Sequence, residues 1–68
     1  MNRKKFVMYM RNNEEYTKEE IIALLMCNSK YEYNFTKDCV IDFLNDGELV
    51  VNNEIIDTVE AFYDFMTI

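Results

Sequence analysis

The chain has 68 residues and a formal net charge of −6, and half of its residues are hydrophobic. This length allows one small domain, over residues 1–68, and so large an apolar share excludes an intrinsically disordered chain. A single glycine excludes the glycine-rich loops that bind phosphate groups, and the absence of histidine removes the commonest general base of enzymes.

The first predicted element is a β-strand over Lys5–Met10. Its sequence, KFVMYM, is rich in residues that favour strands, and its apolar side chains alternate between two faces. Arg3, Lys4 and Lys5 form a basic segment at its start. Such a segment suits either a solvated terminus or a contact with an acidic partner or with nucleic acid.

A helix is predicted over Tyr16–Asn28. Thr17 and Glu20 form a T-x-x-E capping box, in which each side chain accepts a hydrogen bond from a free backbone N–H group at the helix start. Tyr16 and Ile21 flank this box in the positions of a hydrophobic staple. The apolar stripe that the helix would bury contains Ile21, Leu24 and Leu25.

Residues 29–34, SKYEYN, place Tyr31 and Tyr33 in alternation with polar side chains, which predicts a short strand or an extended connector. Tyrosine is favoured at contact surfaces because its ring is apolar and its hydroxyl is polar. Tyr31 and Tyr33 are therefore candidate partner-binding residues. The alternative is that the two rings close over a small core.

A second helix is predicted from Thr36, its N-cap, to Gly47, a glycine stop. One face is apolar and is expected to lie on the core; it consists of Cys39, Val40, Phe43 and Leu44. The opposite face is acidic, because aspartates recur at every fourth position. This face carries Asp38, Asp42 and Asp46, with Asn45 beside them and Ile41 at its border.

Two short strands, Glu48–Val51 and Glu54–Ile56, are predicted around an Asn52-Asn53 turn, because asparagine tolerates a positive φ. In this hairpin Val50 pairs with Ile55, and Leu49 pairs with Ile56. A third helix follows, capped by Asp57 or Thr58. Its buried face is predicted to contain Val59, Phe62, Tyr63 and Met66, and its outer face Asp57, Glu60 and Asp64.

Cys27 and Cys39 lie on the apolar sides of predicted helices, so we expect two small buried hydrophobes in a reducing compartment. A disulfide between neighbouring helices is the alternative. Two cysteines without histidine cannot complete a tetrahedral zinc site, and no calcium loop fits around Gly47. We therefore expect no metal, no cofactor and no enzymatic activity.

The segment Phe6–Met10 is too short for a secretory signal, and no stretch approaches the roughly 20 apolar residues that a membrane span needs. We expect a cytoplasmic protein that does not contact a membrane. All seven basic residues precede residue 38, whereas residues 38–68 carry eight acids and no base. Such an acidic half repels phosphate backbones and favours basic partners, unless it is only solvated.

The order of capped helix, second helix, glycine stop and hairpin, from about Thr17 to Asp57, resembles the helix, recognition helix and wing of a winged helix-turn-helix domain. The resemblance implies an α+β fold, which on our elements runs β-α-α-β-β-α with a short antiparallel sheet. This family normally begins with a helix, where we predict a strand. Its recognition helix contacts DNA, but here that helix presents acids where phosphate contacts require Lys or Arg.

The size, the acidity and a composition rich in Asn, Lys, Ile, Tyr and Glu are similar to those of small proteins from phages and mobile elements. Many such proteins, anti-CRISPR and other anti-defence inhibitors among them, bind and disable one host protein. The similarity implies a non-enzymatic inhibitor or adaptor, active in the host cytoplasm, that acts as a DNA mimic on a basic, nucleic-acid-binding surface. The expected partner-binding residues are Asp38, Ile41, Asp42, Asn45, Asp46, Glu48, Tyr31 and Tyr33.

Two other functions fit the same residues. A small transcriptional regulator would bind DNA through the basic segment Arg3–Lys5 with Arg11 and Lys18, and could do so as a homodimer. A structural or assembly module would instead associate through Tyr31, Tyr33 and Ile41.

Overall fold

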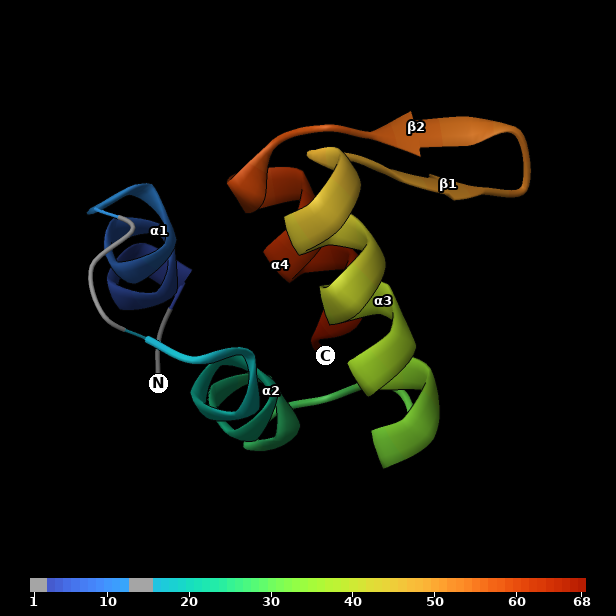
Figure 1. Ribbon diagram of the computed structural model, residues 1–68. Helices are drawn as coiled ribbons and strands as arrows, with labels where there is room; N and C mark the ends of the chain where they lie inside the picture. The colour runs from blue at the N-terminus through green and yellow to red at the C-terminus, as the bar shows by residue number, and fades with distance from the viewer. Residues whose placement is uncertain (1–2, 13–15) are drawn as a thin grey trace.

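The computed structural model describes residues 3–12 and 16–68. Within these residues the chain forms a small α+β domain with four helices and one two-stranded antiparallel sheet (Figure 1). The elements in chain order are α1 (Arg3–Asn12), α2 (Lys18–Met26), α3 (Tyr33–Asp46), β1 (Leu49–Val51), β2 (Glu54–Ile56) and α4 (Val59–Met66).

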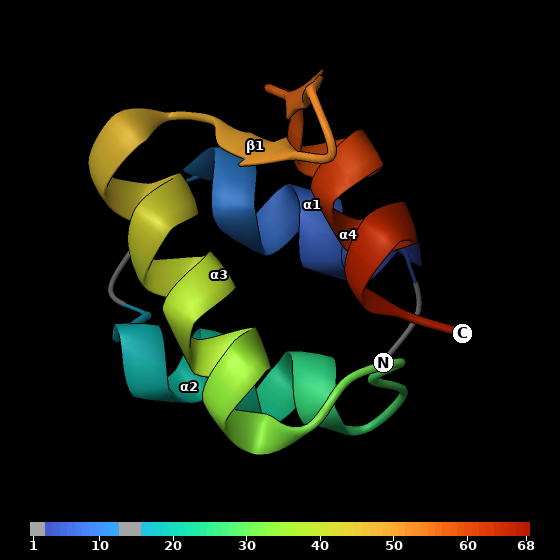
Figure 2. The ribbon, with the colours of Figure 1, turned by 90° about the vertical axis from the view of Figure 1, so that its right-hand side faces the viewer.

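The helices form two packed pairs. The first helix, α1, lies against the last, α4, and α2 lies against α3. The hairpin β1–β2 follows α3 and projects from one end of the helical body (Figures 1 and 2). Every helix and β1 contribute to one core, whose buried members are Phe6, Ile21, Ile22, Leu25, Cys39, Val40, Phe43, Leu49, Phe62, Tyr63 and Met66.

The strand predicted over Lys5–Met10 is wrong, because this segment lies within the helix α1. Phe6 is fully buried with its ring centroid 5.1 Å from that of Tyr63, and Met10, one turn later, packs against the same core. Because its apolar side chains lie on both faces, the segment fits both the alternating pattern of a strand and the spacing of a helix. Packing against α4 stabilises the helix. The order of elements is therefore α-α-α-β-β-α.

The predicted capping box of α2 is confirmed. The N–H group of Glu20 donates to Thr17 Oγ1 at 3.2 Å, and the N–H group of Thr17 donates to Glu20 Oε1 at 3.4 Å. These bonds satisfy two of the backbone donors that the first turn of a helix leaves unpaired. They fix the start of α2 and turn Ile21 and Leu25 into the core.

The helix α3 begins at Tyr33, three residues before the predicted N-cap. Thr36 lies inside the first turn and is fully buried, and its N–H group donates to the carbonyl of Glu32 at 3.0 Å. Its hydroxyl lies 3.1 Å from the hydroxyl of Ser29, so it is satisfied by the preceding connector. This partner explains why a threonine can be buried where the sequence indicated a cap.

The connector between α2 and α3 contains no strand; Ser29 alone forms an isolated bridge, with Thr67. Two backbone hydrogen bonds extend this contact, from the N–H group of Ile68 to the carbonyl of Asn28 at 2.9 Å and from that of Lys30 to Met66 at 2.8 Å. The residues after α4 are thus fixed to the connector.

The hairpin and its flanking signals are confirmed. Gly47 ends α3 with a φ of 73°, and Asn52 and Asn53 turn the chain with φ values of 50° and 67°. The register pairs Val50 with Ile55, as expected. Thr58 caps α4 by accepting a hydrogen bond from the N–H group of Ala61 at 3.1 Å. Among the described residues, no helix combines the length and apolar character needed to cross a bilayer.

Candidate partner-binding surface

The acidic face predicted on the second helix is exposed on α3. Burial of Cys39, Val40 and Phe43 fixes the inner side of the helix. The aspartates at every fourth position then lie outside, separated by about 6 Å along the axis. Together with Glu48, which is exposed directly after Gly47, these aspartates make up what we call the acidic ridge; its members are Asp38, Asp42, Asp46 and Glu48.

The acidic ridge forms no ion pair with the basic side chains of residues 3–12 and 16–68. Among the residues that the structure describes, the ion pairs of the acidic half lie elsewhere, between Arg3 and Asp64 at 2.9 Å and between Arg11 and Glu60. Both pairs join α1 to α4. The acids on the outer face of α4 are therefore partly neutralised by the chain itself, and those of the ridge remain available to a partner.

Two residues border the ridge as the sequence indicated. Asn45 is exposed on the outside of α3, and Ile41 is half-buried beside it. Leu44, in contrast, was expected in the core, and its exposed fraction is 44%. It lies on the flank of α3 that faces α1 and α2, where the helices do not close over it.

The two candidate tyrosines have different environments. Tyr33 is exposed at the start of α3. Tyr31 is half-buried, with its ring centroid 4.7 Å from that of Phe35 and 5.3 Å from that of Phe65. Tyr31 therefore closes over the core, as the alternative interpretation expected, and Tyr33 is accessible.

Phe35 was not among the predicted site residues, although 40% of its surface is exposed. It lies three residues before Asp38 and seven before Asp42, a spacing that places the three side chains on one side of the helix. This spacing is visible in the sequence, but it is informative only once the helix is known to begin at Tyr33. The ridge thus ends in an exposed aromatic ring.

Cys39 lies in the core next to the ridge. Burial, together with the negative charges of Asp42 and Asp38, raises the pKa of its thiol to about 11. The thiol therefore stays protonated at neutral pH and does not act as a nucleophile. Cys27 was also expected to be buried, but it is exposed. It follows the buried Leu25 by two residues, which places it nearly opposite the buried stripe of α2.

The basic residues of the alternative DNA-binding surface are partly engaged. Arg3 and Arg11 lie at the two ends of α1 and each pairs with an acid of α4. Lys4 and Lys18 are exposed. Phosphate groups would have to compete with the carboxylates of the chain for both arginines, which disfavours this surface as a nucleic-acid site.

Among the described residues, no three Cys, Asp or Glu side chains are arranged to hold a metal ion. The ridge is an extended row, so its chemistry is the pairing of separate carboxylates with separate cations. No protein-family model, curated protein or solved structure matches this chain.

Proposed function

We propose that this protein is a non-enzymatic inhibitor or adaptor, encoded by a phage or mobile element and of the anti-defence type. It acts in the host cytoplasm, where the acidic ridge covers a basic, nucleic-acid-binding surface of a host protein. The observation that carries this proposal is the row of four exposed carboxylates, from Asp38 to Glu48, that forms no ion pair within the described chain.

The ridge has the properties that a basic surface recognises. Lys and Arg side chains bind carboxylates through charge-assisted hydrogen bonds, which are about twice as strong as neutral ones. Surfaces that bind nucleic acid present Lys and Arg toward a row of phosphates. Carboxylates that recur about every 6 Å along a rigid helix imitate part of such a row.

The neighbours of the ridge supply the remainder of an interface. Phe35 and Tyr33 are exposed aromatic side chains at the start of α3, and Ile41 and Asn45 border the aspartates. Aromatic side chains often contribute a large share of binding energy when a partner covers them. The proposed contact surface therefore runs along the outside of α3 from Phe35 to Glu48, with Tyr33 exposed at the same end of the helix but on the side opposite Asp42.

We also infer a winged-helix-like domain. The helix α1 stands where that family normally has its first helix, and α3 is followed by a hairpin in the place of the wing. On this interpretation the helix that would read DNA in that family carries acids instead. The fold would then present its usual binding helix to a protein and not to DNA.

The test is a pull-down from bacterial lysate with the tagged protein, followed by identification of the retained protein. The change Asp42→Lys with Asp46→Lys should weaken binding by at least about 100-fold, because it places like charges against a basic surface. The matched control is Glu54→Lys with Asp57→Lys, which alters the net charge equally at exposed residues outside the ridge.

Loss of the partner in the ridge variant but not in the control supports the proposal, provided that both variants retain the helical circular dichroism of the wild type. The retained host protein should also lose its binding to nucleic acid when the wild-type protein is added. Equal retention by the ridge variant would remove the acidic ridge from the interface and, with it, the proposed function.

A further inference from the structure

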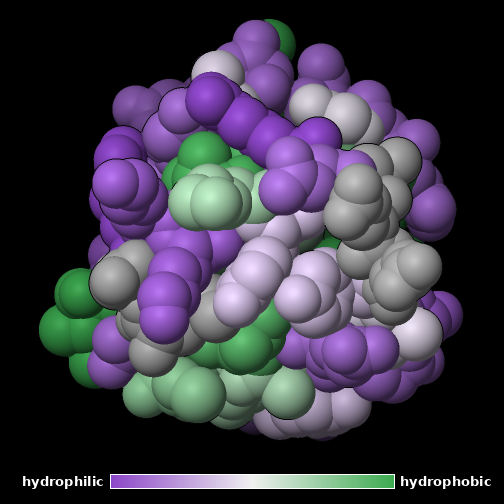
Figure 3. Space-filling model, turned by 90° about the vertical axis from the view of Figure 1, so that its left-hand side faces the viewer, coloured by the Kyte–Doolittle hydropathy of each residue, from purple (hydrophilic) through white to green (hydrophobic). Residues whose placement is uncertain are grey.

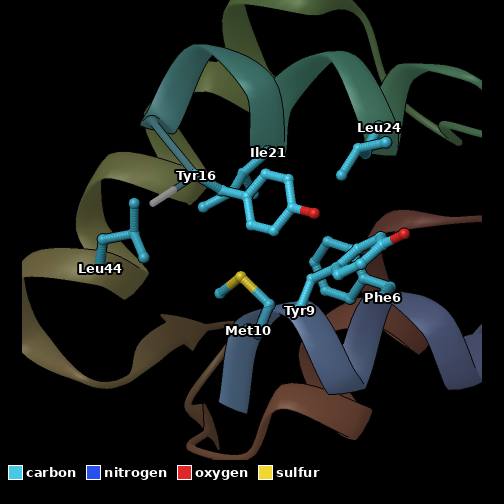
Figure 4. A pocket seen from close by; sticks show the side chains of 7 residues that line it. All are labelled: Phe6, Tyr9, Met10, Tyr16, Ile21, Leu24 and Leu44. Carbon is cyan, nitrogen blue, oxygen red and sulfur yellow. The ribbon is translucent and has the colours of Figure 1, made fainter. Parts of the chain in front are cut away.

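A cavity of about 260 Å³ lies between α1, α2 and the end of α3 (Figure 4). Its lining side chains converge from these three helices and from the residue before the α2 cap. They are Phe6, Tyr9, Met10, Tyr16, Ile21, Leu24 and Leu44. No member of the acidic ridge takes part, so the cavity is a separate feature of the molecule.

The packing of the helices explains this space. The core is built from the pair α1–α4 and the pair α2–α3, and the cavity lies where α1 and α2, which are not themselves a main packed pair, face each other (Figure 1). The cavity is open to solvent beside Leu44 and Tyr16, whose exposed fractions are 44% and 42%, so a small molecule can enter it. A ligand that binds there only in the folded state would stabilise the fold.

The lining restricts the chemistry of a ligand. Three aromatic rings and the thioether of Met10 favour an aromatic guest, since rings pack in offset or edge-on contacts and sulfur contacts ring edges favourably. None of the seven lining residues is charged. A carboxylate or phosphate group would therefore enter without a counter-charge, which disfavours acidic ligands.

Two tyrosine hydroxyls lie at the edge of this apolar space. The rings of Tyr9 and Tyr16 lie side by side with centroids 4.8 Å apart, and both hydroxyls point to the same side, toward Leu24 (Figure 4). The face of the molecule that carries α1 and α2 also shows apolar patches between its hydrophilic side chains (Figure 3). The hydroxyl of Tyr9 is thus placed to bond a polar group of a ligand that enters between the two helices.

We propose that this cavity binds a small neutral aromatic molecule of one or two fused rings that carries one hydrogen-bonding group. The size agrees with this class, since an apolar cavity of about 150 Å³ accepts benzene. The larger space here suits a bicyclic ring. Indole has such a ring and an N–H donor, and it serves as the probe.

The test is a titration of the methyl-labelled protein with indole, observed by NMR. The methyl signals of Met10, Ile21 and Leu44 should shift and saturate below about 1 mM indole, the weak end of specific binding. The methyl signals of Val50 and Ile55 are the internal control, because these residues are exposed on the hairpin. Indole-3-acetate, which adds a carboxylate to the same ring, should bind at least about tenfold more weakly.

Two variants complete the experiment. Leu44→Trp fills the cavity from its exposed side and should abolish the shifts while the spectrum remains that of a folded protein. Tyr9→Phe keeps the volume and removes the hydroxyl, so the affinity for indole should fall about fivefold, the value of one neutral hydrogen bond. The affinity for benzene should not change.

The absence of shifts in the wild-type protein at about 1 mM indole would overturn the proposal, and so would equal shifts at the hairpin methyls. These outcomes depend on the wild-type protein alone, so they hold even if a variant fails to fold. They also leave the proposed function untouched, because the titration involves no residue of the acidic ridge.

Discussion

Phe43 and Phe62 stack with their ring centroids 4.3 Å apart and their planes inclined by 10°, which joins α3 to α4 at the centre of the core. Phe62 is fully buried. We expect Phe62→Ala to lower the free energy of unfolding by about 3–5 kcal/mol, the usual cost of removing a buried ring. For a domain of this size that cost approaches the whole stability. Urea unfolding followed by circular dichroism measures it.

Phe62→Leu is the control for this prediction. It keeps most of the apolar volume and loses the ring contact, so it should cost clearly less than the alanine change. Equal losses in the two variants would mean that the ring contact with Phe43, and not the buried apolar volume, accounts for the stabilisation at this position.

The contact between Arg3 and Asp64 predicts a pH dependence. The hydrogen bond from the Arg3 guanidinium holds the pKa of Asp64 below its ordinary value of 3.8. A carboxylate whose pKa is lower in the folded state stabilises the fold above the unfolded pKa, and this stabilisation is lost as the pH falls through the folded pKa. Asp64→Asn should therefore lower the thermal midpoint slightly at neutral pH and have no effect in strong acid.

The effect is small because both side chains are more than half exposed. Thermal melts of the wild type and of Asp64→Asn, compared from neutral pH to about pH 2, measure it. Asp57→Asn serves as the reference, since Asp57 is exposed and has no ion pair among the described residues. A gap between the wild type and Asp64→Asn that widens in acid would contradict the assignment.

The two thiols should differ in reactivity. Cys27 is exposed, whereas Cys39 is buried and has its pKa raised to about 11 by desolvation and by Asp42 and Asp38. At neutral pH a thiol reagent should therefore modify Cys27 rapidly and Cys39 only as the domain unfolds. Absorbance after addition of an aromatic disulfide reports both phases. In Cys27→Ser the fast phase should vanish; its survival would place Cys39 at the surface.

Gly47 sets the angle between α3 and the hairpin through its positive φ of 73°. An added Cβ would meet no atom within 4 Å, so the cost of a substitution comes from the backbone alone. We expect Gly47→Ala to destabilise the domain by about 1 kcal/mol, the penalty for a left-handed conformation in an L-residue. Chemical denaturation checks the value, and Gly47→Asn should cost less because asparagine tolerates this conformation.

The transcriptional-regulator alternative makes its own prediction. If Arg3, Arg11 and Lys18 do not bind phosphates, genomic DNA fragments should migrate unchanged in low-salt gels with added protein. Low salt favours any electrostatic contact with DNA, so it is the most demanding condition for this prediction. Retarded bands that disappear as the salt rises would support DNA binding through the basic residues.

Local signals in the sequence were sufficient for the start of α2, the end of α3 and the hairpin. The Thr17–Glu20 box, Gly47 and the Asn52-Asn53 turn each depend on neighbours in the chain, and each is found in the structure. The exposure of Asp38, Asp42 and Asp46 followed from the helical period once the apolar face was recognised. The acidic ridge could therefore be predicted as a geometric feature from the sequence alone.

The other features, namely the helix α1, the start of α3 and the cavity, depend on contacts between distant parts of the chain. The helical state of α1 depends on Phe6 reaching Tyr63 of the last helix, which no local pattern indicates. The early start of α3 depends on the hydroxyl of Ser29 satisfying Thr36. The cavity lies between α1, α2 and α3, which come together only in the folded chain, so Leu44 lines an open space although its position in the sequence is typical of a core residue.

The pairing of α1 with α4 has a consequence for synthesis on the ribosome. Phe6 emerges early, but its ring partner Tyr63 lies in α4 and is made after the other elements described here, so α1 cannot complete its packing until α4 has been translated. Until α4 is available, the apolar face of α1 is in contact with water or with a chaperone. The contact between α1 and α4 can therefore form only after α4 has left the exit tunnel.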